Sequence, residues 1–164
     1  MNKLIVAMLA MAVSAVASSA EPAAAPAATP PTQEQVIAQF KQDLAAKRAD
    51  VMAKGLTLTA EQASKFWPLF EQYLKEQDAS VDAQIKATQA YHEHYATLTD
   101  AQALEYVTAL LARDGAAHDL RVKWLAKFQT VVPPKVAARA IQLDRRLSQV
   151  MQVQVSSQIP LITQ

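Results

Sequence analysis

The sequence of 164 residues has no cysteine, only two glycines and few aromatic residues. Without cysteine the chain cannot form a disulfide, attach haem covalently or use a thiol nucleophile. The patterns GxSxG and HExxH and a glycine-rich phosphate loop are also absent, and the carboxylates are scattered along the chain. We therefore expect no catalytic residues and no cofactor, and the chain is not predicted to be an enzyme.

Helix-breaking residues are scarce beyond the N-terminal region, whereas Ala, Leu, Gln and Lys are abundant. Apolar periodicity and proline positions predict helices over about residues 33–53 and 59–95, a third from residue 99, and a fourth over 134–157. Pro68 inside the second helix predicts a kink. We expect an all-α fold, an elongated, curved four-helix hairpin or bundle whose second and third helices are long.

The N-terminus has the pattern of a secretory signal peptide. Lys3 precedes an apolar run over residues 4–13 that continues through small residues to Ala20. The apolar run is shorter than the ~20 residues of a membrane-spanning helix, so cleavage is expected, with a retained anchor as the alternative. The predicted organisation is a signal peptide over 1–20, an Ala/Pro-rich linker over 21–32, and an exported helical domain over 33–164.

A five-residue pattern, Leu-Thr-x-x-Gln, occurs twice, at Leu58–Gln62 and at Leu98–Gln102. In each copy the threonine can cap a helix while the glutamine reaches back to the cap amide, as in a capping box. The preceding leucine lies where it can pack against the first turn or a neighbouring helix. The predicted capping residues are Leu58, Thr59, Gln62, Leu98, Thr99 and Gln102.

Placing residues at ~100° intervals gives each long helix an apolar seam. On the second helix the seam is Phe66, Phe70, Tyr73, Gln77, Gln84, Thr88, Tyr91 and Tyr95. On the third it is Leu104, Val107, Leu111, His118, Val122 and Leu125, and on the fourth Val136, Ala140, Leu143, Leu147 and Val150. We expect these seams to face the core, with the aromatic cluster over residues 66–70 inside it.

Charge is distributed unevenly. Residues 55–112 carry three lysines and eight acids, whereas residues 113–146 carry eight bases and three acids. On the fourth helix, Lys135, Arg139 and Arg146 lie ~80° from the centre of its seam. This basic rim pairs with the acidic helices of the same fold, is simply solvated, or holds exposed segments of other proteins. The chain from residue 21 onward is neutral overall, so nucleic acid is not an expected partner.

Three histidines are the candidate pH-sensing or metal-binding residues. His92 and His94 are two positions apart, ~160° around a helix, and cannot share one ion unless that segment unwinds. His118 lies alone on the third seam, where a core or interface role is the alternative. We therefore expect no resident metal, although a zinc-responsive sensor stays open as the second functional class.

The signal peptide, the two LTxxQ motifs forty positions apart, the long helices and the lack of cysteine together resemble the Spy/CpxP group of periplasmic proteins. The stretches AKGLTLTAEQASKFWPLFEQY and VVPPKVAARAIQLDRRL and the ending QIPLI are more similar to an uncharacterised secreted helical branch of that group. The resemblance implies a homodimer and an ATP-independent chaperone or envelope-stress adaptor. Its expected partners are unfolded or envelope proteins.

Overall fold

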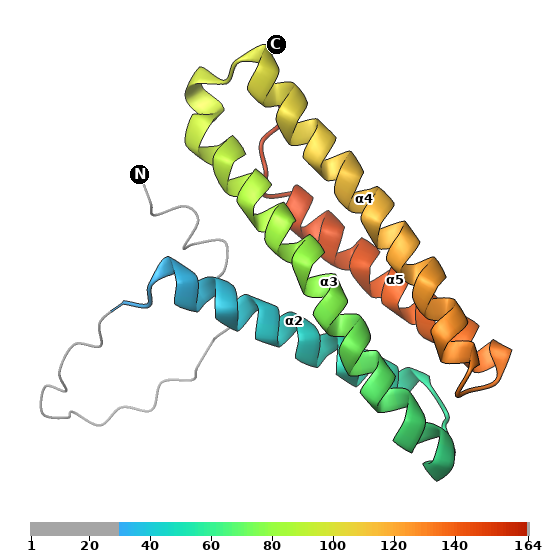
Figure 1. The fold of residues 1–164 in the computed structure, drawn as a ribbon. Helices are drawn as coiled ribbons and strands as arrows, with labels where there is room; N and C mark the ends of the chain where they lie inside the picture. Colours follow the sequence, from blue (N-terminus) through green and yellow to red (C-terminus); the bar gives the residue numbers. More distant parts are fainter. Residues whose placement is uncertain (1–29, 164) are drawn as a thin grey trace, which may run out of the picture. The chain divides into compact units, whose positions relative to one another are not determined.

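The computed structural model describes residues 30–163, and every regular element in that range is a helix. Four α-helices follow one another as α2 (Gln33–Gly55), α3 (Ala60–His94), α4 (Asp100–Gln129) and α5 (Pro134–Ser156), with the short 3-10 helix η1 (Tyr95–Thr97) after α3 (Figure 1). This confirms the all-α class, and α3 and α4 are long, with 35 and 30 residues. The proposed signal peptide and most of the Ala/Pro-rich linker lie outside the described residues.

The chain divides inside α2 into two compact units, one ending at Leu44 and the other running over Ala45–Gln164. The described part of the first unit contains no buried residue, and the first buried side chain is that of Arg48. The hydrophobic core belongs to the second unit, whose first buried side chain, Arg48, follows shortly after its start at Ala45.

Three helices begin with the same capping box. The Thr59 and Thr99 hydroxyls accept from the amides of Gln62 and Gln102 at 3.2 and 3.3 Å, and both glutamine side chains accept from the cap amides. The predicted capping by Thr59 with Gln62 and by Thr99 with Gln102 is confirmed. A third box, which the sequence analysis missed, lies at Thr32, whose hydroxyl accepts from the Gln35 amide at 3.3 Å while its own amide donates to the Gln35 side chain at 2.8 Å.

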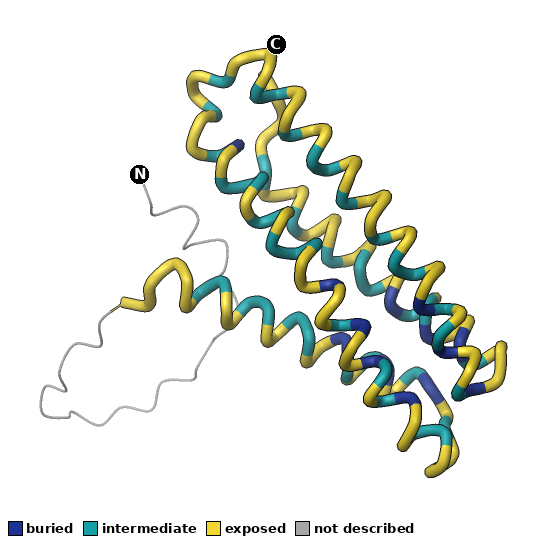
Figure 2. Tube along the Cα trace, in the orientation of Figure 1, coloured by how far each residue is buried: buried dark blue, intermediate teal, exposed yellow. Residues whose placement is uncertain are grey.

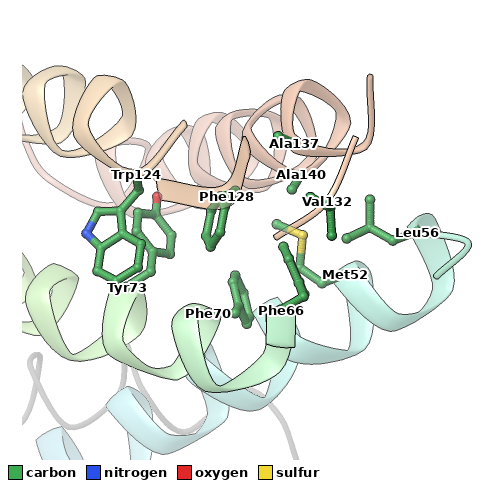
Figure 3. Packing of buried hydrophobic residues seen from close by; sticks show 10 residues of the cluster. All are labelled: Met52, Leu56, Phe66, Phe70, Tyr73, Trp124, Phe128, Val132, Ala137 and Ala140. Carbon is green, nitrogen blue, oxygen red and sulfur yellow. The ribbon is translucent and has the colours of Figure 1, made fainter. Parts of the chain in front are cut away.

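The core of the second unit is built around aromatic rings from α3 and α4 (Figure 3). Phe66 packs on Phe128 with ring centroids 5.0 Å apart, and Tyr73 meets Trp124 edge to face at 5.8 Å. Helices α2 and α5 and the loops that lead to α3 and α5 complete it with smaller side chains. The cluster is Met52, Leu56, Phe66, Phe70, Tyr73, Trp124, Phe128, Val132, Ala137 and Ala140. Of the predicted seam of α3, Phe66, Phe70 and Tyr73 are buried in this core, as expected, whereas Tyr95 is half-buried.

The end of α2 packs closely on α5. A Cβ added to Gly55 would clash with the side chain of Leu143, and the backbone of Gly55 has no positive φ. Glycine at this position leaves room for the end of the Leu143 side chain and does not serve a left-handed cap. Arg139 Nε donates to the Gly55 carbonyl at 2.6 Å, which satisfies one of the unpaired carbonyls at the helix end.

The predicted seam of α4 is wrong for most of its length. Leu104, Leu111 and Val122 are 69, 66 and 58% exposed, and Val107 and His118 are exposed too. The helix has two apolar faces at helical spacing. Tertiary packing selects the face that carries Trp124 and Phe128, because those two large rings fill the space against α3. On α5 the seam is correct as far as Leu147, whereas Val150 is 55% exposed.

Candidate functional site

The strongest candidate for a binding surface is the outward side of α4. Leu104, Val107, Leu111, Gly115, His118 and Val122 lie within about 80° of one another at ~100° per residue, and all six are exposed. They extend over about 27 Å at 1.5 Å per residue. Figure 2 shows exposed positions recurring along the whole helix. We call these six residues the α4 face.

Single exposed apolar residues are ordinary, but a contiguous row of them marks a site of interaction. Four of the six residues of the α4 face are leucine or valine, and the other two are Gly115 and His118. A Cβ at Gly115 would meet nothing within 4 Å, so the middle of the row is open. Another chain could approach the helix closely at this point, as small residues allow between helices.

The basic rim lies on α5, and all three of its predicted residues are exposed. Arg139 is used internally, because its guanidinium donates to Gly55. Lys135 and Arg146 make no hydrogen bond or ion pair with any residue between 30 and 163, and their neighbour Arg145 makes none either. Three cationic groups of α5 are therefore available to an acidic partner, and binding by this rim stays a prediction.

Other basic residues of the stretch 113–146 pair with α3. Glu76 accepts from Lys123 Nζ at 2.7 Å and from the Trp124 indole N–H at 3.0 Å, and Lys127 Nζ lies 3.8 Å from it. These hydrogen bonds hold the pKa of Glu76 below its usual value. Part of the excess negative charge of residues 55–112 is thus neutralised by basic residues of α4 within the same molecule.

A buried carboxylate joins all four helices, and the sequence analysis did not find it. Asp144 of α5 is 1% exposed and forms an ion pair with Arg48 of α2. It also accepts from Arg121 Nε of α4 at 2.9 Å and from the Tyr73 hydroxyl of α3 at 2.7 Å. The hydroxyl of Ser148 accepts from both guanidiniums, at 3.4 and 2.9 Å. We call these five residues the Asp144 network.

Because every polar partner in the Asp144 network is another residue of the same unit, its role is structural. Burial, followed by the negative charge of Asp144, raises the pKa of Tyr73 well above its usual range, so the hydroxyl remains a donor. Two cations face one anion, so the network keeps an excess positive charge below the protein surface. One sequence signal points to the burial of Asp144. This residue lies four positions after Ala140 and seven after Ala137, on the same side of the helix as these small residues.

The structure does not bring the three histidines together into a site. His94 and His118 are exposed, and His92 is half-buried near the end of α3. Over residues 30–163 there is no group of three or more His, Asp or Glu residues placed to hold a metal ion. The described helices also contain no apolar stretch of the length that crossing a bilayer requires.

Comparison of this chain with protein-family models, with curated proteins and with solved structures found no match. The functional argument therefore depends on the surfaces of the molecule itself.

Proposed function

We propose that this chain is an exported helical protein that binds exposed apolar segments of other proteins without ATP, as a chaperone or envelope-stress adaptor. The observation that carries the proposal is the α4 face, a row of exposed leucine and valine side chains along one helix. Such a row presents anchors at helical spacing to an apolar segment of a partner. The resemblance of the two LTxxQ motifs to the Spy/CpxP group supports the same function and a periplasmic location.

The free cations of α5 support a second property of the partner. Lys135, Arg145 and Arg146 attract segments that carry negative charge and speed their encounter at low salt. The apolar α4 face supplies contact area, and the rim selects for acidic character. Clients that are both apolar and acidic are therefore expected to bind best.

The test is suppression of aggregation by the purified protein in the absence of nucleotide. Leu104→Gln with Leu111→Gln and Val122→Gln replaces the three most exposed apolar side chains of the α4 face, and the fold is expected to persist because these positions are already exposed. The matched control is Val150→Gln with Val153→Gln, two valines of α5 that are 55 and 67% exposed and lie off the α4 face. We expect the α4 variant to lose most of its suppression and the α5 variant to keep it.

Self-association is the competing use of the same face, since a homodimer is also expected. Sedimentation velocity on both variants separates the two uses. Loss of a dimer in the α4 variant with suppression unchanged would contradict the proposal, because the face would then serve a second copy. No suppression by the unmodified protein at several-fold molar excess would also contradict it.

A further inference from the structure

The segment after α5 is held by tyrosine hydroxyls. Helix α5 ends at Ser156, and two hydrogen bonds place the chain beyond it beside the C-terminal end of α3. The Tyr91 hydroxyl donates to the carbonyl of Pro160 at 2.9 Å, and the Tyr95 hydroxyl donates to the carbonyl of Leu161 at 2.9 Å. Two tyrosines four positions apart thus hold two consecutive carbonyls. We call this pair the tyrosine seat.

The hydrogen bonds of the seat go to the backbone of the tail and not to its side chains. The Leu161 side chain is 88% exposed, that of Ile162 is 39% exposed, and Pro160 is also exposed. Only Ile159 is half-buried. Because any peptide presents backbone carbonyls, the seat can accept another segment of similar conformation.

Ring contacts between its two tyrosines and with α4 hold the tyrosine seat. Tyr91 is 3% exposed and stacks on Tyr106 of α4 with ring centroids 4.1 Å apart and planes at 14°. Tyr95 meets Tyr91 edge to face at 5.6 Å. Burial, then the neighbouring tyrosines, raises the pKa of Tyr91, so its hydroxyl remains a donor at physiological pH. Packing between α3 and α4 therefore orients the Tyr91 donor.

The residue in the seat also indicates the class of segment that fits. Proline has no backbone N–H, so Pro160 places a carbonyl at a donor without leaving an amide unpaired beside the rings. A proline also fixes φ, and an extended proline-containing segment loses little conformational freedom on binding. Grooves lined by aromatic side chains recognise such segments in other proteins.

We propose that the tyrosine seat is a binding site for extended, proline-containing peptide segments of other proteins, and that the chain's own segment over residues 159–162 occupies it as a displaceable intramolecular ligand. A tether of a few residues gives the tail an effective concentration of about millimolar order. A partner must therefore compete with the tail, and the tail keeps the site closed to weak ligands. The inference does not depend on the α4 face.

The experiment uses the full chain and a synthetic peptide with the sequence of residues 157–164, titrated by NMR. One variant frees the seat by Ile159→Ser, Pro160→Gly, Leu161→Ser and Ile162→Ser, which preserves chain length. In this variant we expect saturable shifts at the end of α3, with an apparent affinity at least about tenfold higher than in the unmodified chain, where the tail competes. A peptide with Gly in place of its proline should bind more weakly.

Two further variants of the freed chain test the donors. Tyr91→Phe with Tyr95→Phe keeps the rings and removes both hydroxyls, and we expect it to lose peptide binding. Tyr106→Phe is the matched control, since its hydroxyl donates to neither tail carbonyl, and it should bind normally.

Three results would overturn the inference. These are absence of binding to the freed chain, equal binding by the Tyr91/Tyr95 variant, and equal binding by freed and unmodified chains. Concentration-dependent dimerisation that the tail substitutions abolish would show instead that the seat serves the tail of a second copy. If the α4 variant loses aggregation suppression but still binds the peptide, the tyrosine seat is a separate site from the α4 face.

Discussion

Replacing Asp144 by Asn tests whether the buried network stabilises the four helices as one unit. The carboxylate accepts from two guanidiniums and one tyrosine hydroxyl. An asparagine can present its single oxygen to Arg121 and Tyr73, but its NH₂ group then faces Arg48, donor against donor. The substitution also leaves the buried guanidinium of Arg48 and the partly buried guanidinium of Arg121 without a counter-charge, which costs about 3–5 kcal/mol. That is a large part of the ~5–15 kcal/mol by which a domain of this size is stable.

The assay is urea unfolding at neutral pH, followed by helical circular dichroism. Asp50→Asn is the matched control, because Asp50 pairs with Lys54 on the exposed side of α2 and should lose at most ~0.5 kcal/mol. Arg48→Met should cost less than Asp144→Asn, since it leaves one cation beside one anion. A change of under ~1 kcal/mol for Asp144→Asn, or a larger cost for Arg48→Met, would refute this reasoning.

Three further predictions use the same unfolding measurement. Thr59→Ala removes the cap of α3 and should lower the free energy of unfolding by ~1 kcal/mol. Thr32→Ala should lower it far less, because none of the residues from Thr32 to Leu44 is buried. Equal effects of the two substitutions would contradict this. Gly115→Ala adds a methyl group in open space and should raise the free energy of unfolding by ~0.5–1 kcal/mol. Gly55→Ala should lower it, because the added methyl group meets the Leu143 side chain of α5. A stabilising Gly55→Ala with a destabilising Gly115→Ala would contradict this prediction. Burial raises the pKa of Tyr73, so its hydroxyl loses its proton at lower pH in the unfolded state than in the folded state. The free energy of unfolding should therefore be level below pH ~10 and fall above it by up to ~1.4 kcal/mol per pH unit. The Tyr73→Phe variant should show a shallower fall. An identical slope in that variant would exclude Tyr73 as the cause.

Most of the fold could be predicted from local signals. Helices α3 and α4 begin directly after Thr59 and Thr99. These starts are predictable because a capping box involves residues only three positions apart. The start of α5 follows from the fixed φ of Pro134. Thr32 and Gln35 carry the same capping signal, with Pro31 in the position of the leucine.

The candidate site was harder to predict because it depends on which face of a helix is covered. Helical periodicity shows that Leu104 and Leu111 share a side of α4, but it does not say whether that side faces α3 or solvent. Trp124 and Phe128 decide this through their contacts with Phe66 and Tyr73, far away in the sequence. The Asp144 network and the tyrosine seat are hydrogen bonds between distant segments, and no local pattern reports them.

The most direct test of the proposed function is site-specific photo-cross-linking from the α4 face during aggregation of a client protein. A photoreactive residue at Leu111, which is 66% exposed, should capture the unfolding client without ATP. The same group at Gln142, an exposed polar position of α5, should capture far less. Strong capture at Leu111 and weak capture at Gln142 is the predicted result, and equal capture at both positions, or none at Leu111, would contradict the assignment of client binding to the α4 face.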